Sequence, residues 1–231
     1  MLMSKKFVKQ VAEQCEPLYQ LGEGNVKMYW ENKPTKEEAI EYFGRRMINE
    51  RINCIELSRR VSQLPNDTPP DEMFLLSKQA HDEAKHFWFV KEILEDLSGS
   101  PVNVEETHKS IKATQRWPLY AELLSQFECA EDPMALAMYQ FIAEGLAHRN
   151  WVAQSKCAPT KMIAEKYAEI AKDEKFHAQI GRRQLEKLIV DEKSMAHAKE
   201  LSQEILDLLW SFASADKDRC VKSMVSLHTA H

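Results

Sequence analysis

A short sequence pattern that can bind a metal ion occurs twice in this chain. Residues 82–86 read DEAKH, and residues 173–177 read DEKFH. Each places a glutamate and a histidine three positions apart, which on an α-helix puts both side chains on one face, about one turn apart. A carboxylate and an imidazole placed in this way can bind one metal ion together. The first candidate ligands are therefore Glu83, His86, Glu174 and His177.

The residue before each glutamate separates these two pairs from a third Glu-x-x-His at 105–108, which we interpret as a chance occurrence. Asp82 and Asp173 precede the glutamates of the first two pairs, whereas the third pair lacks this aspartate. An aspartate beside a metal-bound histidine can accept a hydrogen bond from the second ring N–H. The alternative for either aspartate is an exposed charge one residue away from the metal-binding face.

Helices must carry these pairs, and the composition predicts an all-α chain. Among 231 residues there are only six glycines and nine prolines, which favours helices over strands. Apolar periodicity and capping residues predict four long helices, at about 36–63, 69–97, 133–155 and 160–189. Two shorter helices are expected within 102–131, and a last amphipathic helix at about 193–213. Residues 1–33 are expected to be a lead-in, helical from 5 to about 21, and residues 214–231 a mobile tail.

Local signals place several helix ends. Thr35 and Glu38 have the spacing of a capping box at the start of the first long helix. Thr68 is the predicted N-cap of the second long helix, with Pro69 as its first residue. That helix is expected to end at Gly99, and within the lead-in a loop through Gly22 and Gly24 is expected after the helical part.

The register of two helical hairpins selects the remaining ligands. In an antiparallel hairpin, residues equally far from the turn lie at one height. Glu50 is about 17 residues before the turn near residue 67 and Glu83 is about 16 after it, whereas Glu56 is displaced by roughly 7–8 Å at 1.5 Å per residue. Glu144 and Glu174 lie about 14 and 16 residues from the turn near residue 158. Glu50 also lies within an apolar stripe, where an unpaired carboxylate is costly.

These residues resemble the ligand set of the ferritin-like di-iron carboxylate proteins, which include ribonucleotide reductase small subunits, bacterial di-iron monooxygenases and rubrerythrins. The resemblance covers residues 36–190. It implies a four-helix bundle with extra short helices in the crossover between the second and third long helices, a C-terminal helix, and one domain over 1–231. It also implies that each aspartate serves the histidine of the opposite hairpin. The implied metal ligands are Glu50, Glu83, His86, Glu144, Glu174 and His177.

The chemistry of this set favours iron or manganese. Four carboxylates and two imidazoles suit Fe or Mn better than Cu, and four negative charges balance two divalent ions. We expect two Fe ions, with Mn/Fe or Mn/Mn as alternatives, and O2 as a co-substrate. The expected function is an oxygenase or oxidase that acts on a small organic substrate by hydroxylation, N-oxygenation, desaturation or oxidative cleavage. An iron-handling or peroxide-detoxifying protein of the ferritin or rubrerythrin kind is the alternative, and a bundle that only binds a partner is a third.

Neighbouring residues narrow the function. Val90 stands where a radical-generating ribonucleotide reductase subunit is expected to carry a tyrosine, which argues against that role. The five cysteines include no C-x-x-C pair, which argues against a fused rubredoxin module. His148 lies one turn after Glu144 on the same face and is the candidate catalytic residue. It could be an extra ligand, a proton donor to bound oxygen, or a hydrogen-bonded core histidine.

Composition and charge limit the partners. A net charge of −5 gives no basic field for nucleic acid. No apolar run approaches the roughly 18 residues that span a membrane, and the cysteine usage suits a reducing cytoplasm. No flavin or nicotinamide fingerprint is present, so electrons are expected from a separate reductase or ferredoxin. The resemblance implies a homodimer.

Overall fold

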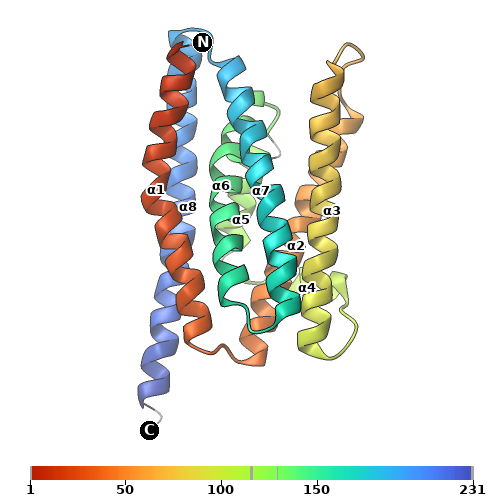
Figure 1. Cartoon of the computed structure of the whole chain (residues 1–231), viewed down its shortest axis with the longest axis vertical. Coiled ribbons are helices and arrows are strands. Elements are labelled where there is room, and N and C mark those ends of the chain that lie inside the picture. The colour runs from red at the N-terminus through yellow and green to blue at the C-terminus, as the bar shows by residue number, and fades with distance from the viewer. Residues whose placement is uncertain (1, 115–116, 129, 230–231) are drawn as a thin grey trace. The chain divides into compact units, whose positions relative to one another are not determined.

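The computed structural model describes residues 2–114, 117–128 and 130–229, and within these ranges the side chains of all residues except 2, 128, 216 and 218–229. All regular structure in this part of the chain is helical, as the sequence predicted (Figure 1). The helices divide into two compact units, Met1–Lys33 with Ala121–His231 and, separately, Pro34–Tyr120. We call these unit 1 and unit 2.

Unit 1 contains most of the long helices. Its elements are α1 (Leu2–Glu31), the π-helix η1 (Leu124–Glu128), α6 (Pro133–Cys157), α7 (Lys161–Leu188) and α8 (Glu192–Thr229). Unit 2 contains α2 (Lys36–Ser62), α3 (Pro70–Ser98) and α4 (Val104–Lys112). The chain passes from one unit to the other twice, between Lys33 and Pro34 and between Tyr120 and Ala121, and the second point lies within the short helix α5 (Trp117–Leu123).

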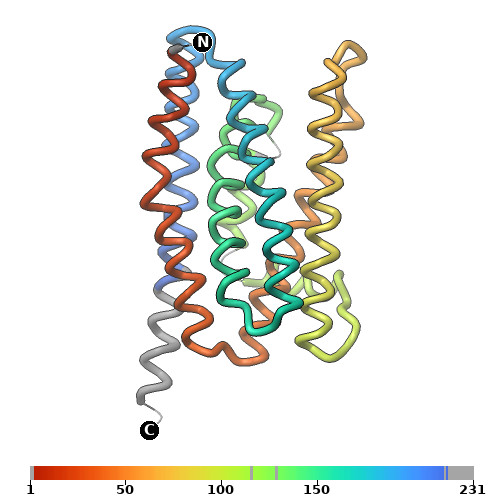
Figure 2. Tube along the Cα trace, in the orientation of Figure 1, coloured from red at the N-terminus to blue at the C-terminus, as the bar shows by residue number. Residues whose placement is uncertain are grey.

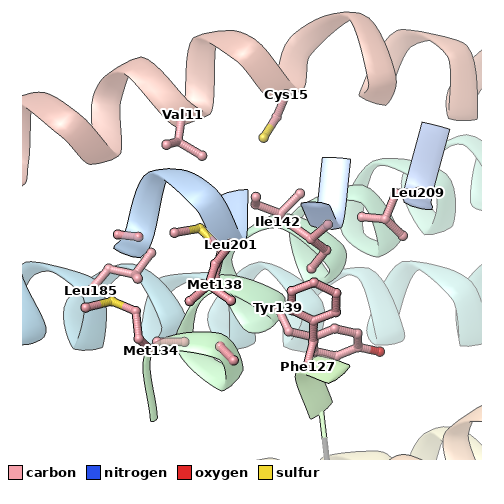
Figure 3. Close-up of a cluster of buried hydrophobic side chains, with 14 of the residues drawn as sticks. Val11, Cys15, Phe127, Met134, Met138, Tyr139, Ile142, Leu185, Leu201 and Leu209 are labelled. Carbon is pink, nitrogen blue, oxygen red and sulfur yellow. The ribbon is translucent and has the colours of Figure 1, made fainter. Parts of the chain in front are cut away.

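In unit 1, α6 and α7 pack as a hairpin, and α1 and α8 pack along it (Figures 1 and 2). The core between these helices is mostly aliphatic, with some aromatic and sulfur-containing side chains, and Figure 3 shows side chains from all four helices meeting there. Because α1 supplies residues such as Val11 and Cys15 to this core, it is an integral part of the unit rather than a lead-in. Burial raises the pKa of the Cys15 thiol to about 11, so this thiol is held protonated at neutral pH.

The prediction that the first helix ends near residue 21 is wrong. α1 continues through Gly22 and Gly24 to Glu31. Gly22 faces α6, and a Cβ added there would come within 2.5 Å of the Asn150 Oδ1 and 2.8 Å of Leu146. The glycine therefore allows α1 and α6 to approach closely. In the sequence alone, a glycine at this position indicates a turn, because its packing partner is far away along the chain.

In unit 2, α2 and α3 form a second hairpin, and α4 packs on α2. The predicted capping box is confirmed: the Thr35 hydroxyl accepts from the Glu38 amide at 3.2 Å, and the Glu38 carboxylate accepts from the Thr35 amide at 2.8 Å. α3 begins one residue later than predicted, with Pro69 as the N-cap. Gly99 closes α3 in the left-handed conformation, with φ of 71°.

Other predicted boundaries hold to within a few residues. The two short helices between 102 and 131 are present as α4 and α5, and α5 continues into η1. Asp132 and Thr160 cap α6 and α7 through their side chains. The prediction that the last helix ends near 213 is wrong, because α8 extends to Thr229. The predicted mobility of residues 214–231 stays a prediction, because most of the side chains in this range lie outside the described part of the structure.

Two further points concern organisation. A single domain over residues 1–231, with a core bundle at 36–190, stays a prediction; the two hairpins that would form that bundle belong to different units. Across the described ranges, no helix combines the length and the apolar character needed to cross a membrane.

Candidate metal centre

Three predicted ligands meet inside unit 1. Glu144 lies on α6, and Glu174 and His177 lie on α7, with ligand atoms that are all within 4.8 Å of one another. All three side chains are buried. The Nδ1 of His177 is 3.1 Å from the Oε2 of Glu174. The spacing of three residues therefore places Glu174 and His177 side by side on α7, as the sequence pattern predicted.

The other three predicted ligands meet inside unit 2. Glu50 lies on α2, and Glu83 and His86 lie on α3, again with ligand atoms within 4.8 Å of one another. The Nδ1 of His86 is 3.8 Å from the Oε2 of Glu50 and 3.7 Å from the Oε2 of Glu83. Glu83 and His86 are both 0% exposed. The register argument that chose Glu50 over Glu56 is thus matched by proximity, whereas Glu56 pairs with Arg59 on the outside of α2.

The spacing of these donors suits a shared cation. Two donors that each lie about 2.1 Å from one ion, at right angles, are about 3 Å apart. The Nδ1-to-carboxylate distances of 3.1, 3.7 and 3.8 Å run from about that separation to somewhat longer. In both units the ring nitrogen that faces the carboxylates is Nδ1. Nδ1 is therefore the histidine atom in position to share an ion with the glutamates.

Burial of four glutamates makes a bound cation chemically reasonable. Glutamate is almost never fully buried unless it is paired or coordinates a metal, because desolvating a carboxylate is costly. Here Glu50, Glu83, Glu144 and Glu174 are all at most 5% exposed. Each unit places two carboxylates beside one imidazole, so each group carries two negative charges against one divalent ion. These buried groups could hold a metal ion.

A contact that the sequence reasoning missed supports the group in unit 1. The indole Nε1 of Trp151, on α6, donates a hydrogen bond to Glu174 Oε1 at 3.2 Å. The Trp151 ring packs against the ring of Tyr167, with centroids 4.8 Å apart. From the sequence, Trp151 could be a wall of the site or an ordinary core residue. Its position seven residues after Glu144, two turns along the same helix face, was the available signal.

The two aspartates next to the glutamates differ in exposure. Asp82 is buried and forms an ion pair with Lys78, one turn earlier on α3. The alternative that Asp82 is an exposed charge is therefore wrong. Asp173 is half-buried on α7. A hydrogen bond from either aspartate to a metal-bound histidine stays a prediction.

His148 lies outside both groups of ligand atoms. It is half-buried on α6, and its Nδ1 is 2.7 Å from the backbone oxygen of Ala171 on α7. A carbonyl oxygen only accepts hydrogen bonds, so Nδ1 carries the proton that it donates. This bond leaves Nε2 as the nitrogen that could bind or transfer a proton, and it links α6 to α7 one turn before Glu174.

The pair interpreted as a chance occurrence joins neither group. Glu105 is exposed and forms an ion pair with Lys109 at 2.7 Å on α4. His108 is half-buried against the ring of Trp117, with centroids 5.7 Å apart. Partial burial lowers its pKa, with the positive charges of Lys112 and Arg51 acting in the same direction.

Comparison with known proteins adds no relative: no family model, curated protein or solved structure matches the chain. The described part of the chain is all-helical, and its buried groups of glutamates and histidines are compatible with a di-iron site. The ferritin-like assignment stays a prediction that rests on the ligand pattern and its spacing.

Proposed function

We propose that the chain is an O2-activating, non-haem di-iron oxidoreductase, an oxygenase or oxidase that acts on a small organic substrate. The observation that carries this proposal is the repetition of one arrangement. Each hairpin buries two glutamates and one histidine, with Nδ1 of the histidine facing the carboxylates. In the proposal, each hairpin supplies three ligands to a pair of iron ions in a ferritin-like four-helix bundle.

The donor set fits this metal pair. Carboxylate oxygens and imidazole nitrogens suit Fe or Mn, and four glutamates neutralise two divalent ions. Both groups lack cysteine, which would favour softer metals. When bound, a reduced iron pair would supply two electrons to O2, and the remaining electrons would come from the substrate or the external donor.

The protein's own residues have three tasks in this scheme. The glutamates and histidines bind and fix the ions, and their burial keeps bulk water away from the reactive centre. Trp151 holds one oxygen of Glu174 by its hydrogen bond. We assign to His148 Nε2 the role of holding a proton near the centre, because Nδ1 is engaged with the Ala171 carbonyl.

The proposal also names partners. Electrons come from a separate reductase or ferredoxin, because the sequence carries no fingerprint for flavin or nicotinamide. The substrate is a small organic molecule, and hydroxylation, N-oxygenation, desaturation and oxidative cleavage all fit the chemistry of the centre. A cytoplasmic homodimer completes the proposal.

Oxygen uptake tests the function directly. The protein is loaded anaerobically with Fe(II), freed of unbound metal, mixed with O2 and followed with an oxygen electrode. We expect rapid uptake of about one O2 per two bound Fe(II), since two electrons are available from the pair. We expect uptake to be lost in Glu174→Gln and kept in Glu105→Gln, which alters the exposed glutamate of the chance pair. Slow uptake with many irons per chain would instead indicate iron storage, and no uptake would refute the oxidoreductase proposal.

A further inference from the structure

We infer that Trp151 is a positioning residue for Glu174: its indole N–H holds Oε1, so that Oε2 is the oxygen presented to the metal beside His177. This inference deepens the proposed function and rests on it, because it assigns a role to Trp151 only if Glu174 binds a metal ion. It concerns residues of α6 and α7 alone, which belong to one unit.

The two oxygens of Glu174 have different partners. Oε1 accepts from Trp151 Nε1 at 3.2 Å, and Oε2 is 3.1 Å from His177 Nδ1. A carboxylate can bind a cation through one oxygen or through both, and a hydrogen bond on one oxygen favours binding through the other. Indole is a donor only and keeps its proton at every ordinary pH. Trp151 therefore biases Glu174 toward binding through Oε2, whatever the pH.

The indole is itself held in place. Trp151 is 1% exposed, and its ring packs on Tyr167, which is 0% exposed, with an interplanar angle of 31°. Trp151 follows Glu144 by seven residues on α6, and Tyr167 precedes Glu174 by seven residues on α7. Seven residues are about two helical turns, so both rings lie on the helix faces that carry the ligands. The pair forms an aromatic layer next to the ligand layer.

The direction of the side chain completes the geometry. In a helix, side chains lean toward the N-terminus, so Trp151 reaches back along α6 toward Glu144. In the antiparallel hairpin this is the direction of Glu174 on α7. The reach of a large side chain therefore brings a donor from the neighbouring layer to the carboxylate. A smaller residue at position 151 could fill part of the space without reaching Oε1.

A purely structural role for Trp151 makes a different prediction. If the ring only fills the core, its replacement should lower stability and leave the metal affinity and the metal spectrum unchanged. The informative experiment therefore measures metal binding as well as folding. Co(II) is a suitable probe, because its visible absorption reports the coordination of the ion and because binding can be followed without O2 chemistry.

The test compares two tryptophan-to-phenylalanine variants. Trp151→Phe removes the donor to Glu174, and Trp30→Phe removes an indole donor from α1 to Gln154 Oε1, 2.5 Å away, on the same helix α6. We expect Trp151→Phe to weaken Co(II) binding about 10- to 100-fold and to change the visible spectrum of the bound ion. We expect Trp30→Phe to keep the affinity and the spectrum of the natural protein.

A second substitution separates the donor from the shape. Benzothienylalanine incorporated at position 151 replaces the N–H by sulfur and keeps nearly the same ring. We expect it to reproduce the loss of Co(II) affinity seen in Trp151→Phe, even if the phenylalanine variant is poorly folded by circular dichroism. Unchanged Co(II) affinity and spectrum in the benzothienylalanine protein would overturn the inference.

The same data distinguish this inference from the proposed function. If the natural protein binds no Co(II), both fail. If it binds Co(II) and the two position-151 proteins bind equally well, only the role of Trp151 is refuted. If those proteins lose affinity but the iron-loaded natural protein consumes no O2, the positioning role stands and the oxidoreductase proposal falls.

Discussion

Gly181 of α7 lies directly against the backbone of α6 at Phe141. A Cβ added to Gly181 would be 2.5 Å from the Phe141 amide nitrogen and 2.6 Å from the Ala137 oxygen, closer than Cβ atoms approach in proteins. Gly181 is four residues after His177, and Phe141 is three residues before Glu144. This close approach of the two helices is therefore about one turn from their ligands, so the contact helps to set the distance across which the ligands meet.

Gly181→Ala should force α6 and α7 apart. Backbone atoms cannot give way as a flexible side chain can, so we expect the free energy of unfolding to fall by about 1–3 kcal/mol. Urea unfolding followed by circular dichroism measures this change. Because the same displacement separates Glu144 from the ligands on α7, we also expect weaker metal binding.

Gly24→Ala is the matched control. Gly24 lies within α1, and a Cβ added there meets nothing within 4 Å. Alanine has the higher helix propensity, so this variant should gain roughly 0.5–1 kcal/mol of stability. If Gly181→Ala gained stability by a similar amount, the close approach of α6 and α7 would be wrong.

Arg149 joins α1 to α6 through two glutamates. Its guanidinium donates to Glu23 and, at 3.2 and 3.3 Å, to Glu16. The Arg149 side chain is half-buried, so its ion pairs with Glu16 and Glu23 should contribute more to stability than exposed ion pairs and less than fully buried ones. Arg149→Met, which keeps most of the apolar stem, should therefore lower the free energy of unfolding at pH 7 by about 1–2 kcal/mol.

The effect of Arg149 should depend on pH. Its hydrogen bond lowers the pKa of the Glu16 carboxyl below the ordinary value of 4.5. A lowered folded-state pKa contributes stability that is present above pH 4.5 and is lost as the pH falls through the lowered pKa. The stability difference between the natural protein and Arg149→Met should therefore shrink between pH 7 and pH 3 in denaturant titrations.

Arg182→Met provides the comparison for both measurements. Arg182 pairs with Glu186 one turn later on the exposed side of α7, with a side chain that is 55% exposed. Such pairs contribute about 0.3–0.5 kcal/mol. If Arg182→Met lowered the free energy of unfolding as much as Arg149→Met, the ion pairs of Arg149 with Glu16 and Glu23 would contribute no more than an ordinary exposed pair.

His148→Gln should leave the metal content unchanged. Nδ1 of His148 donates to the Ala171 carbonyl, and the residue lies outside both groups of ligand atoms. We expect about two metal ions per chain in this variant, as in the natural protein. Elemental analysis after metal loading measures this directly. The loss of one ion would show that His148 is a ligand, through the Nε2 that its bond to Ala171 leaves open.

The features that the sequence predicted well depend on local rules. Glu83 and His86 share a helix face because of helical periodicity alone, and Thr35 caps α2 because its partner Glu38 is three residues away. The choice of Glu50 and Glu144 needed one further step, the register of an antiparallel hairpin. That step succeeds when both helices are long and the turn between them is short.

The features that the sequence did not predict depend on contacts between distant residues. Gly22 reads as the end of a helix, and only its contact with Asn150 explains why α1 continues. The sequence leaves Trp151 as either a wall of the site or a core residue, because its bond to Glu174 depends on the reach of one side chain from α6 to α7. Such contacts are set by packing distances, which residue spacing does not encode.

The central claim, that these glutamates and histidines hold two metal ions, is tested most directly by counting metal. The protein is loaded anaerobically with Fe(II), desalted and analysed for iron per chain, together with Glu83→Gln, Glu174→Gln and Glu105→Gln. We predict about two irons per chain in the natural protein and in Glu105→Gln, and loss of stoichiometric iron in the other two variants. No tightly bound iron in the natural protein, or an equal loss at Glu105, would contradict the account.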